Sequence, residues 1–140
     1  MGKEKVIEVF MVEDNPDDIE LTLEAFRESK KGFNVNVAQD GIEAMQYLRR
    51  EGEFGDRPSP ELILLDLNMP RMNGFEVLEE INKDEELKKI PVVVFSISQS
   101  AEDMERVHSL NARSYIIKPV GMEGLIEVVN QLEVIAEDGI

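Results

Sequence analysis

Apolar residues along the chain fall into short runs, and the segments between the runs have helical periodicity. Four runs cover Val6–Val12 (interrupted by Glu8), Leu62–Leu65, Val92–Phe95 and Tyr115–Ile117. Three of them are nearly continuous in Val and Ile, as is typical of strands buried on both faces of a parallel sheet. Residues 33–38 alternate apolar and polar side chains instead, which predicts a fifth strand nearer the sheet edge.

Between these runs, apolar residues recur every three or four positions, as on one face of a helix. The first helix is expected to begin at an Asn15 cap with Pro16 in its first turn. Asp40 and Ser100 are expected to cap the second and fourth helices, and Asn111 to end the fourth in the left-handed conformation. The apolar positions are Ile19, Leu23 and Phe26; Ile42, Met45 and Leu48; Phe75, Leu78 and Ile81; Met104, Val107 and Leu110; and, from about Met122, Leu125, Val128, Val129, Leu132 and Ile135.

The order is therefore strand then helix, repeated five times. This alternation predicts an α/β fold with a parallel sheet and right-handed crossovers. We expect one domain over residues 1–140, because the chain has no internal repeat and no interdomain linker. The segment 51–61, which contains two glycines and two prolines, is expected to be a long loop before the third strand.

The amino-acid composition excludes several classes of function. The 140 residues carry 15 Lys and Arg against 30 Asp and Glu, a net charge of −15, so neither nucleic acid nor an anionic membrane is an expected partner. There is no cysteine and only one histidine, which excludes disulfide scaffolds, thiol catalysis and cysteine-ligated metals. No apolar run approaches the ~20 residues that span a bilayer. A cytoplasmic location is the expectation.

Polar residues follow the predicted strands at their carboxyl ends, where parallel sheets form their sites. Glu13 and Asp14 follow the first strand and Asp66 the third, while Ser96 and Lys118 follow the fourth and fifth. Three crowded carboxylates require a cation, and oxygen ligands suit Mg²⁺ or Mn²⁺. Asp66 is then a plausible nucleophile toward a phosphoryl group, with Ser96 and Lys118 positioned to bind its oxygens. Asp17 and Asp18 are explained sufficiently by helix N-terminus stabilisation.

The chain resembles the receiver domain of two-component response regulators over residues 6–133. The motifs that carry the resemblance are Val12-Glu13-Asp14-Asn15; Asp66-Leu67-Asn68-Met69-Pro70 with Gly74; Pro91-Val92-Val93-Val94-Phe95-Ser96; and Tyr115-Ile116-Ile117-Lys118-Pro119. The long loop before the third strand resembles that of single-domain regulators, chemotaxis-type and phytochrome-associated. The resemblance implies a doubly wound, flavodoxin-like (βα)5 sheet with strand order 2-1-3-4-5.

The resemblance also implies a role for each residue. Asp66 would accept a phosphoryl group from the phosphohistidine of a sensor histidine kinase. Glu13, Asp14, Asp66 and the backbone carbonyl of Asn68 would hold Mg²⁺, with Mn²⁺ as a possible substitute. Lys118 would bridge Asp66 and the phosphoryl group. Ser96 would move toward the phosphoryl group while Tyr115 turns inward, as a two-state switch.

Further expectations concern the backbone and the lifetime of the phosphorylated state. The Lys118–Pro119 bond is expected to be cis, and Gly74 is expected to supply a positive φ. Ile97 stands where the family usually has a small residue, so it is expected to shield the phosphoryl group from water and slow autodephosphorylation. Asn68 and Ser98 occupy the other positions that could tune this rate. The protein is thus expected to be a phosphoacceptor with self-catalysed chemistry only, not an enzyme acting on other substrates.

Other protein classes fit less well. A haloacid-dehalogenase-type phosphatase needs a second carboxylate two residues after the nucleophile, where this chain has Asn68. A flavodoxin would bind an anionic phosphate where the chain has Glu13 and Asp14. Residues after Asp66 do not match an EF-hand. A phosphorylation-independent interaction module on the same fold stays open, and it is distinguished by whether Asp66 is modified.

The output is expected to leave through a protein surface, because no output segment follows residue 140. The downstream target is unknown. The surface of the fourth helix, fifth strand and fifth helix, which the family uses for homodimers or targets, would include Met104, His108, Arg113 and Glu127.

Overall fold

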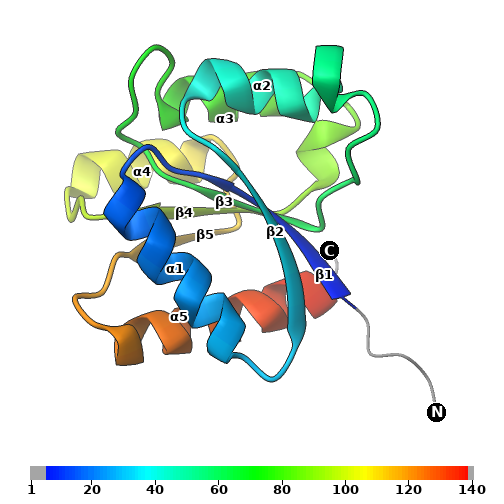
Figure 1. The fold of residues 1–140 in the computed structure, drawn as a ribbon. Helices are drawn as coiled ribbons and strands as arrows, with labels where there is room; N and C mark the ends of the chain where they lie inside the picture. The colour runs from blue at the N-terminus through cyan, green and yellow to red at the C-terminus, as the bar shows by residue number, and fades with distance from the viewer. Residues whose placement is uncertain (1–5, 139–140) are drawn as a thin grey trace.

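A computed structural model describes residues 6–138 of the chain. Five strands and five α-helices alternate along it, and the sheet lies between two helical layers (Figure 1). Two single turns of 3-10 helix, Gly52–Phe54 and Leu87–Lys89, interrupt the loops. The elements are β1 Val6–Val12, α1 Pro16–Glu28, β2 Gly32–Ala38, α2 Gly41–Leu48, β3 Leu62–Leu65, α3 Gly74–Asn82, β4 Val92–Ser96, α4 Ala101–Ser109, β5 Ser114–Ile117 and α5 Met122–Asp138.

The sheet is parallel throughout, with strand order β2-β1-β3-β4-β5, so the predicted fold class and order are confirmed. β1 is an interior strand that pairs with β2 on one side and β3 on the other, where Val9 is in register with Val35 and Leu62. The edge position predicted for residues 33–38 is confirmed. β5 forms the other edge, and its last residue Ile117 is 39% exposed.

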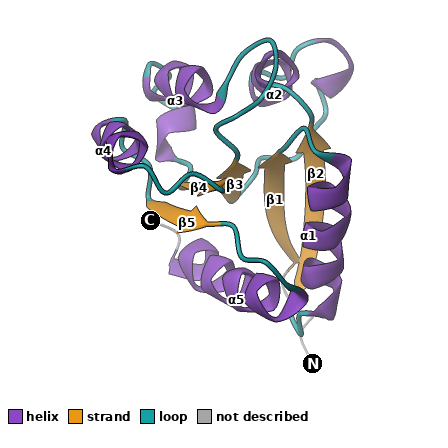
Figure 2. Ribbon diagram, turned by 90° about the vertical axis from the view of Figure 1, so that its left-hand side faces the viewer, coloured by secondary structure: helices purple, strands orange, loops and turns teal. Residues whose placement is uncertain are grey.

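The two faces of the sheet bury separate cores (Figure 2). α2, α3 and α4 cover one face, where Phe10 and Ile63 are fully buried. α1 and α5 cover the other face, where Leu62 and Leu132 are fully buried. Because alternate residues of a strand point to opposite faces, the continuous apolar run of β3 supplies both cores.

The predicted caps account for where the helices begin. The Asn15 side chain accepts hydrogen bonds from the backbone of Asp17 and Asp18, and Asp40 and Ser100 each accept one from the residue three positions on. Such caps satisfy backbone N–H groups that have no partner within the helix. Asn111 has φ of 65°, as predicted for the residue after α4.

The loop between α2 and β3 is ordered by one side chain. The guanidinium of Arg57 donates to the backbone carbonyls of Tyr47 at 2.7 Å and Leu48 at 2.6 Å, and stacks over the Tyr47 ring. These carbonyls belong to the last turn of α2, which has no helical partners for them. Arg57 of this loop thereby caps the C-terminus of α2.

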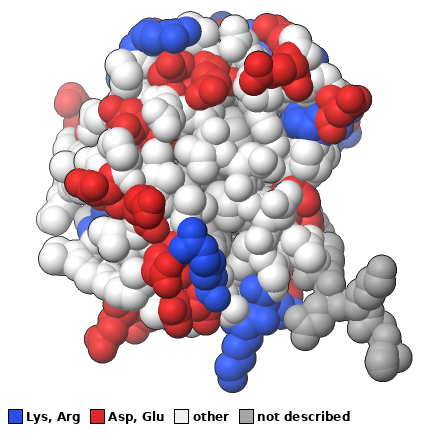
Figure 3. All heavy atoms as spheres, in the orientation of Figure 1, with Lys and Arg blue, Asp and Glu red and all other residues white. Residues whose placement is uncertain are grey.

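The negative charge is spread over the surface. Figure 3 shows several separate groups of Asp and Glu side chains on one face, with fewer Lys and Arg among them. The described helices are all too short or too polar to cross a membrane.

Candidate functional site

The site lies at the carboxyl edge of the sheet. The chain leaves β1 toward α1 on one face and leaves the adjacent β3 toward α3 on the other, so the direction of the connections reverses between these two strand ends. This reversal is where α/β folds bind ligands. The sheet's hydrogen bonds continue one residue past each strand: Glu13 donates its backbone N–H to Ala38 O at 2.9 Å, and Asp66 to Val12 O at 3.0 Å. Both acids are therefore held on rigid backbone.

Three carboxylates converge at these strand ends. Glu13, Asp14 and Asp66 each place an oxygen within 4.8 Å of the others. Glu13 is 3% exposed and Asp66 6%, while Asp14 is half-buried. One oxygen of Asp66, Oδ1, accepts the Leu67 backbone N–H at 2.8 Å. The predicted acidic cluster is therefore assembled.

Lys118 is the cation nearest these acids. Its Nζ lies 2.7 Å from Glu13 Oε1, 2.9 Å from Asp18 Oδ2 and 3.6 Å from Asp66 Oδ2. Its backbone N–H donates to Ser96 O, so β4 and β5 fix where the side chain starts. Burial acts to lower the pKa of Lys118, but the hydrogen bonds to Glu13 and Asp18 and the charge on Asp66 together raise it above its usual value.

The negative charge of the acids around Lys118 exceeds what this one lysine balances. Burial and the nearby charge of Asp66 together raise the pKa of Glu13 to about 7, while the hydrogen bond and the charge of Lys118 act to lower it. The donor set consists of oxygen atoms only, which is what hard divalent cations such as Mg²⁺ and Mn²⁺ select. The residues therefore fit a divalent cation, held by Glu13, Asp14 and Asp66.

Ser96 and Tyr115, the two residues expected to form a switch, are linked through Ser98. Ser96 is fully buried and its Oγ accepts the Ser98 backbone N–H at 3.2 Å. The Tyr115 hydroxyl donates to Ser98 O at 2.9 Å, and Ser98 Oγ donates to Asp103 Oδ2 at 2.7 Å. Hydrogen bonds therefore connect the loop after β4 to both β5 and α4. A movement of Ser96 would shift this loop and, through these bonds, act on β5 and α4.

Two of the residues predicted to tune the phosphoryl lifetime are open to solvent. Ile97, directly after the buried Ser96, is 71% exposed. Asn68, two residues beyond Asp66, is also exposed.

Two backbone predictions are wrong. The described residues contain no cis peptide bond, so Lys118–Pro119 is trans. Trans is the lower-energy isomer by about 0.5–1 kcal/mol, and the long Lys118 side chain reaches the acids from it. Gly74 does not have a positive φ either; among described glycines only Gly52 does. Gly74 is required for another reason: a Cβ there would overlap the Asp66 carbonyl oxygen and lie 2.7 Å from Leu67 Cα.

One residue of the site was missed. Asp18 was attributed to helix stabilisation, but its carboxylate contacts the Lys118 ammonium. Side chains in a helix point toward its N-terminus, and the N-terminus of α1 lies at the carboxyl edge of the sheet. An acid in that first turn therefore points toward Lys118, the residue that directly follows β5. The contact between Asp18 and Lys118 was therefore predictable from the sequence only in combination with the strand order of the sheet.

Comparison with known proteins agrees with this geometry. The family model of the response regulator receiver domain matches residues 9–130. Response regulator Rcp1 of Synechocystis sp. is 36% identical over 125 residues, covering 89% of this chain and 85% of Rcp1. The crystal structure of the phosphorylated cyanobacterial phytochrome response regulator RcpA is 43% identical with a TM-score of 0.86, covering 92% of each chain. The Mn²⁺-bound structure of Rcp1 is 35% identical with a TM-score of 0.83, covering 91% of each.

The chain therefore belongs to the response regulator receiver domain family, whose members act in two-component signalling and are phosphorylated on aspartate. The predicted resemblance and function class are confirmed. The acidic cluster and the Mn²⁺-bound relative agree with divalent cation binding. The family consists of signalling proteins, not of classical enzymes.

Proposed function

We propose that Asp66 accepts a phosphoryl group from the phosphohistidine of a sensor histidine kinase. The observation that carries this proposal is the Asp66 carboxylate itself. It is buried at the end of a central strand, one oxygen is held by Leu67, and Oδ2 faces Lys118 at 3.6 Å. In the transfer, an Asp66 oxygen forms a bond to phosphorus as the nitrogen–phosphorus bond breaks, and the imidazole leaves.

Glu13, Asp14, Asp66 and the backbone carbonyl of Asn68 would hold Mg²⁺ (or Mn²⁺). When bound, the cation would neutralise the carboxylates and the phosphoryl oxygens that otherwise repel each other. Lys118 would add a second positive charge beside Asp66, and Ser96 would donate a hydrogen bond to a phosphoryl oxygen. Ser96 accepts from the Ser98 backbone N–H, and the Tyr115 hydroxyl donates to Ser98 O. A movement of Ser96 would therefore shift Ser98, and Tyr115 would turn inward once its hydrogen bond to Ser98 breaks.

The proposed output is contact with another protein through α4, β5 and α5, either a downstream target or a second copy of the chain. The exposed side chains Ile117 on β5 and Val134 on α5 support this, since they offer apolar area on adjacent elements. The phytochrome partnership stated in the name of RcpA supports a photoreceptor kinase as one candidate donor.

Incubation with a small phosphodonor such as phosphoramidate, read by intact mass, tests the proposal. Wild type should gain one phosphoryl group with Mg²⁺ and none with a chelator, and Asp66→Asn should gain none. The isosteric Asn keeps the shape of the site and removes the nucleophile. If wild type is unmodified by the phosphodonor and by kinases, the chain is instead an interaction module that works without phosphorylation.

We further propose that Ile97 slows loss of the phosphoryl group by shielding it from water. Ile97→Ala should shorten the phosphoryl lifetime about five-fold, corresponding to about 1 kcal/mol in the barrier. The lifetime is measured after removing the phosphodonor. Val6→Ala, which truncates another exposed apolar side chain at the amino end of β1, should leave it unchanged. Equal lifetimes for Ile97→Ala and wild type would refute the shielding role.

A further inference from the structure

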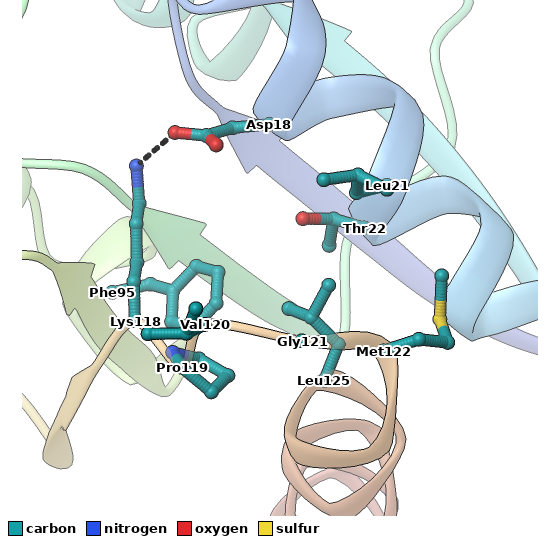
Figure 4. Close-up of a pocket in the computed structure, with 10 residues that line it drawn as sticks. All are labelled: Asp18, Leu21, Thr22, Phe95, Lys118, Pro119, Val120, Gly121, Met122 and Leu125. Atoms are coloured by element: carbon teal, nitrogen blue, oxygen red, sulfur yellow. Dashed lines mark hydrogen bonds and ion pairs between the residues drawn. The ribbon is translucent and has the colours of Figure 1, made fainter.

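The acids around Lys118 do not share it equally. Its ammonium is closer to Glu13, at 2.7 Å, and to Asp18, at 2.9 Å, than to Asp66, at 3.6 Å. Figure 4 shows the Asp18 carboxylate reaching from α1 to the end of the Lys118 side chain, with the ion pair drawn between them. In this state the ammonium is therefore drawn away from the proposed phosphoacceptor.

Helix stabilisation does not account for this contact. Asp17 and Asp18 both lie in the first turn of α1 and both would favour its N-terminus. The cap itself is Asn15, which accepts from both of their backbone N–H groups. What distinguishes Asp18 is that its carboxylate contacts Lys118, and an acid there is not needed for the cap.

The surroundings allow Lys118 to change partners. Asp18 and Lys118 border a cavity of about 120 Å³ between α1 and residues 119–122, with Phe95 and Thr22 also in its wall (Figure 4). A lysine has three donor hydrogens on a flexible stem. Because the side chain borders this space and its ammonium already lies 3.6 Å from Asp66 Oδ2, a side-chain rotation is enough for it to change acceptors.

We propose that Asp18 is a positioning residue that holds Lys118 back and competes with the Asp66 phosphoryl group for its ammonium. This inference rests on the proposed function of Asp66. It adds that the chain carries an internal brake on its own phosphorylation. Asp18 acts in two ways with the same sign: it withdraws a positive charge from the phosphoryl group, and its own negative charge repels that group.

Phosphorylation rates with phosphoramidate and Mg²⁺ test the brake, read by intact mass. Asp18→Asn keeps the shape and removes the charge, and it should react about five-fold faster, which corresponds to about 1 kcal/mol. Asp18→Glu keeps the charge and should stay close to the wild-type rate. Asp17→Asn is the matched control, since it removes the same charge from the same turn, and it should also stay close to wild type.

The outcomes separate the brake from the proposed function. If wild type is modified on Asp66 but Asp18→Asn reacts at the same rate or more slowly, the brake is wrong while the proposed function stands. A similar acceleration in Asp17→Asn would show a general charge effect and overturn the specific role of Asp18, as would Asp18→Glu behaving like Asp18→Asn. If neither wild type nor Asp18→Asn is modified, both proposals fail.

Discussion

Gly74→Ala should lower the free energy of unfolding by about 3 kcal/mol, the upper end of what overpacking usually costs. The added Cβ would overlap the Asp66 carbonyl oxygen and lie 2.7 Å from Leu67 Cα. Both are backbone atoms directly after buried β3, and Gly74 also donates its N–H to Leu67 O at 3.0 Å. The clash can be relieved only by moving α3 or the Asp66 backbone. We expect slower phosphorylation as a second consequence.

Urea unfolding measures this change, with Gly121→Ala as the matched control. A Cβ at Gly121 would meet no atom within 4 Å. We expect that variant to stay within about 0.5 kcal/mol of wild type, as surface substitutions usually do. If Gly74→Ala were as stable as Gly121→Ala, the close approach of α3 to Asp66 would be wrong.

Lys118→Met should lower the free energy of unfolding by about 3 kcal/mol in metal-free buffer, as expected when one partner of a buried ion pair is removed. The substitution leaves an apolar chain of similar length. Glu13 and Asp66, whose side chains are 4% and 8% exposed, would then have lost the cation that contacts both. Unpaired charges in such an environment are costly.

Mg²⁺ should reduce the difference in the free energy of unfolding between Lys118→Met and wild type. A cation that binds only the folded chain stabilises it, by about 2.7 kcal/mol at a hundred-fold excess over Kd, and the variant offers it a more negative site. Chemical denaturation with and without Mg²⁺ measures both effects. Lys83→Met, which removes an exposed surface ion pair with Glu80, serves as the control and should change little. If Mg²⁺ did not reduce the loss of stability in Lys118→Met, the proposed cation site at Glu13, Asp14 and Asp66 would be contradicted.

The sheet could be predicted from sequence because its signals are local. A run such as Leu62–Leu65 fits only a strand buried on both faces, and caps such as Asn15 and Asp40 mark helix starts within a residue. The 3-10 turns were missed because three residues show no periodicity. The edge position of Ile117 could not be predicted from its apolar run, because it depends on the order of the strands in the sheet.

The site was predictable to the extent that its residues follow strand ends. Glu13, Asp14 and Asp66 needed only the parallel sheet to be brought together. Asp18 needed the position of α1 relative to β5, a contact between residues 100 positions apart. The packing reason for Gly74 lies likewise in a contact with backbone that is not adjacent to it in sequence.

The measurement that tests the central claim most directly is identification of the residue that carries the phosphoryl group. Borohydride reduces an acyl phosphate to an alcohol, so a phosphorylated aspartate becomes homoserine, which peptide mass spectrometry locates. After reaction with phosphoramidate and Mg²⁺, we predict homoserine at position 66 and unchanged carboxylates at Glu13 and Asp14. Reduction at Asp14 or another acid, with Asp66 unmodified, would contradict the account.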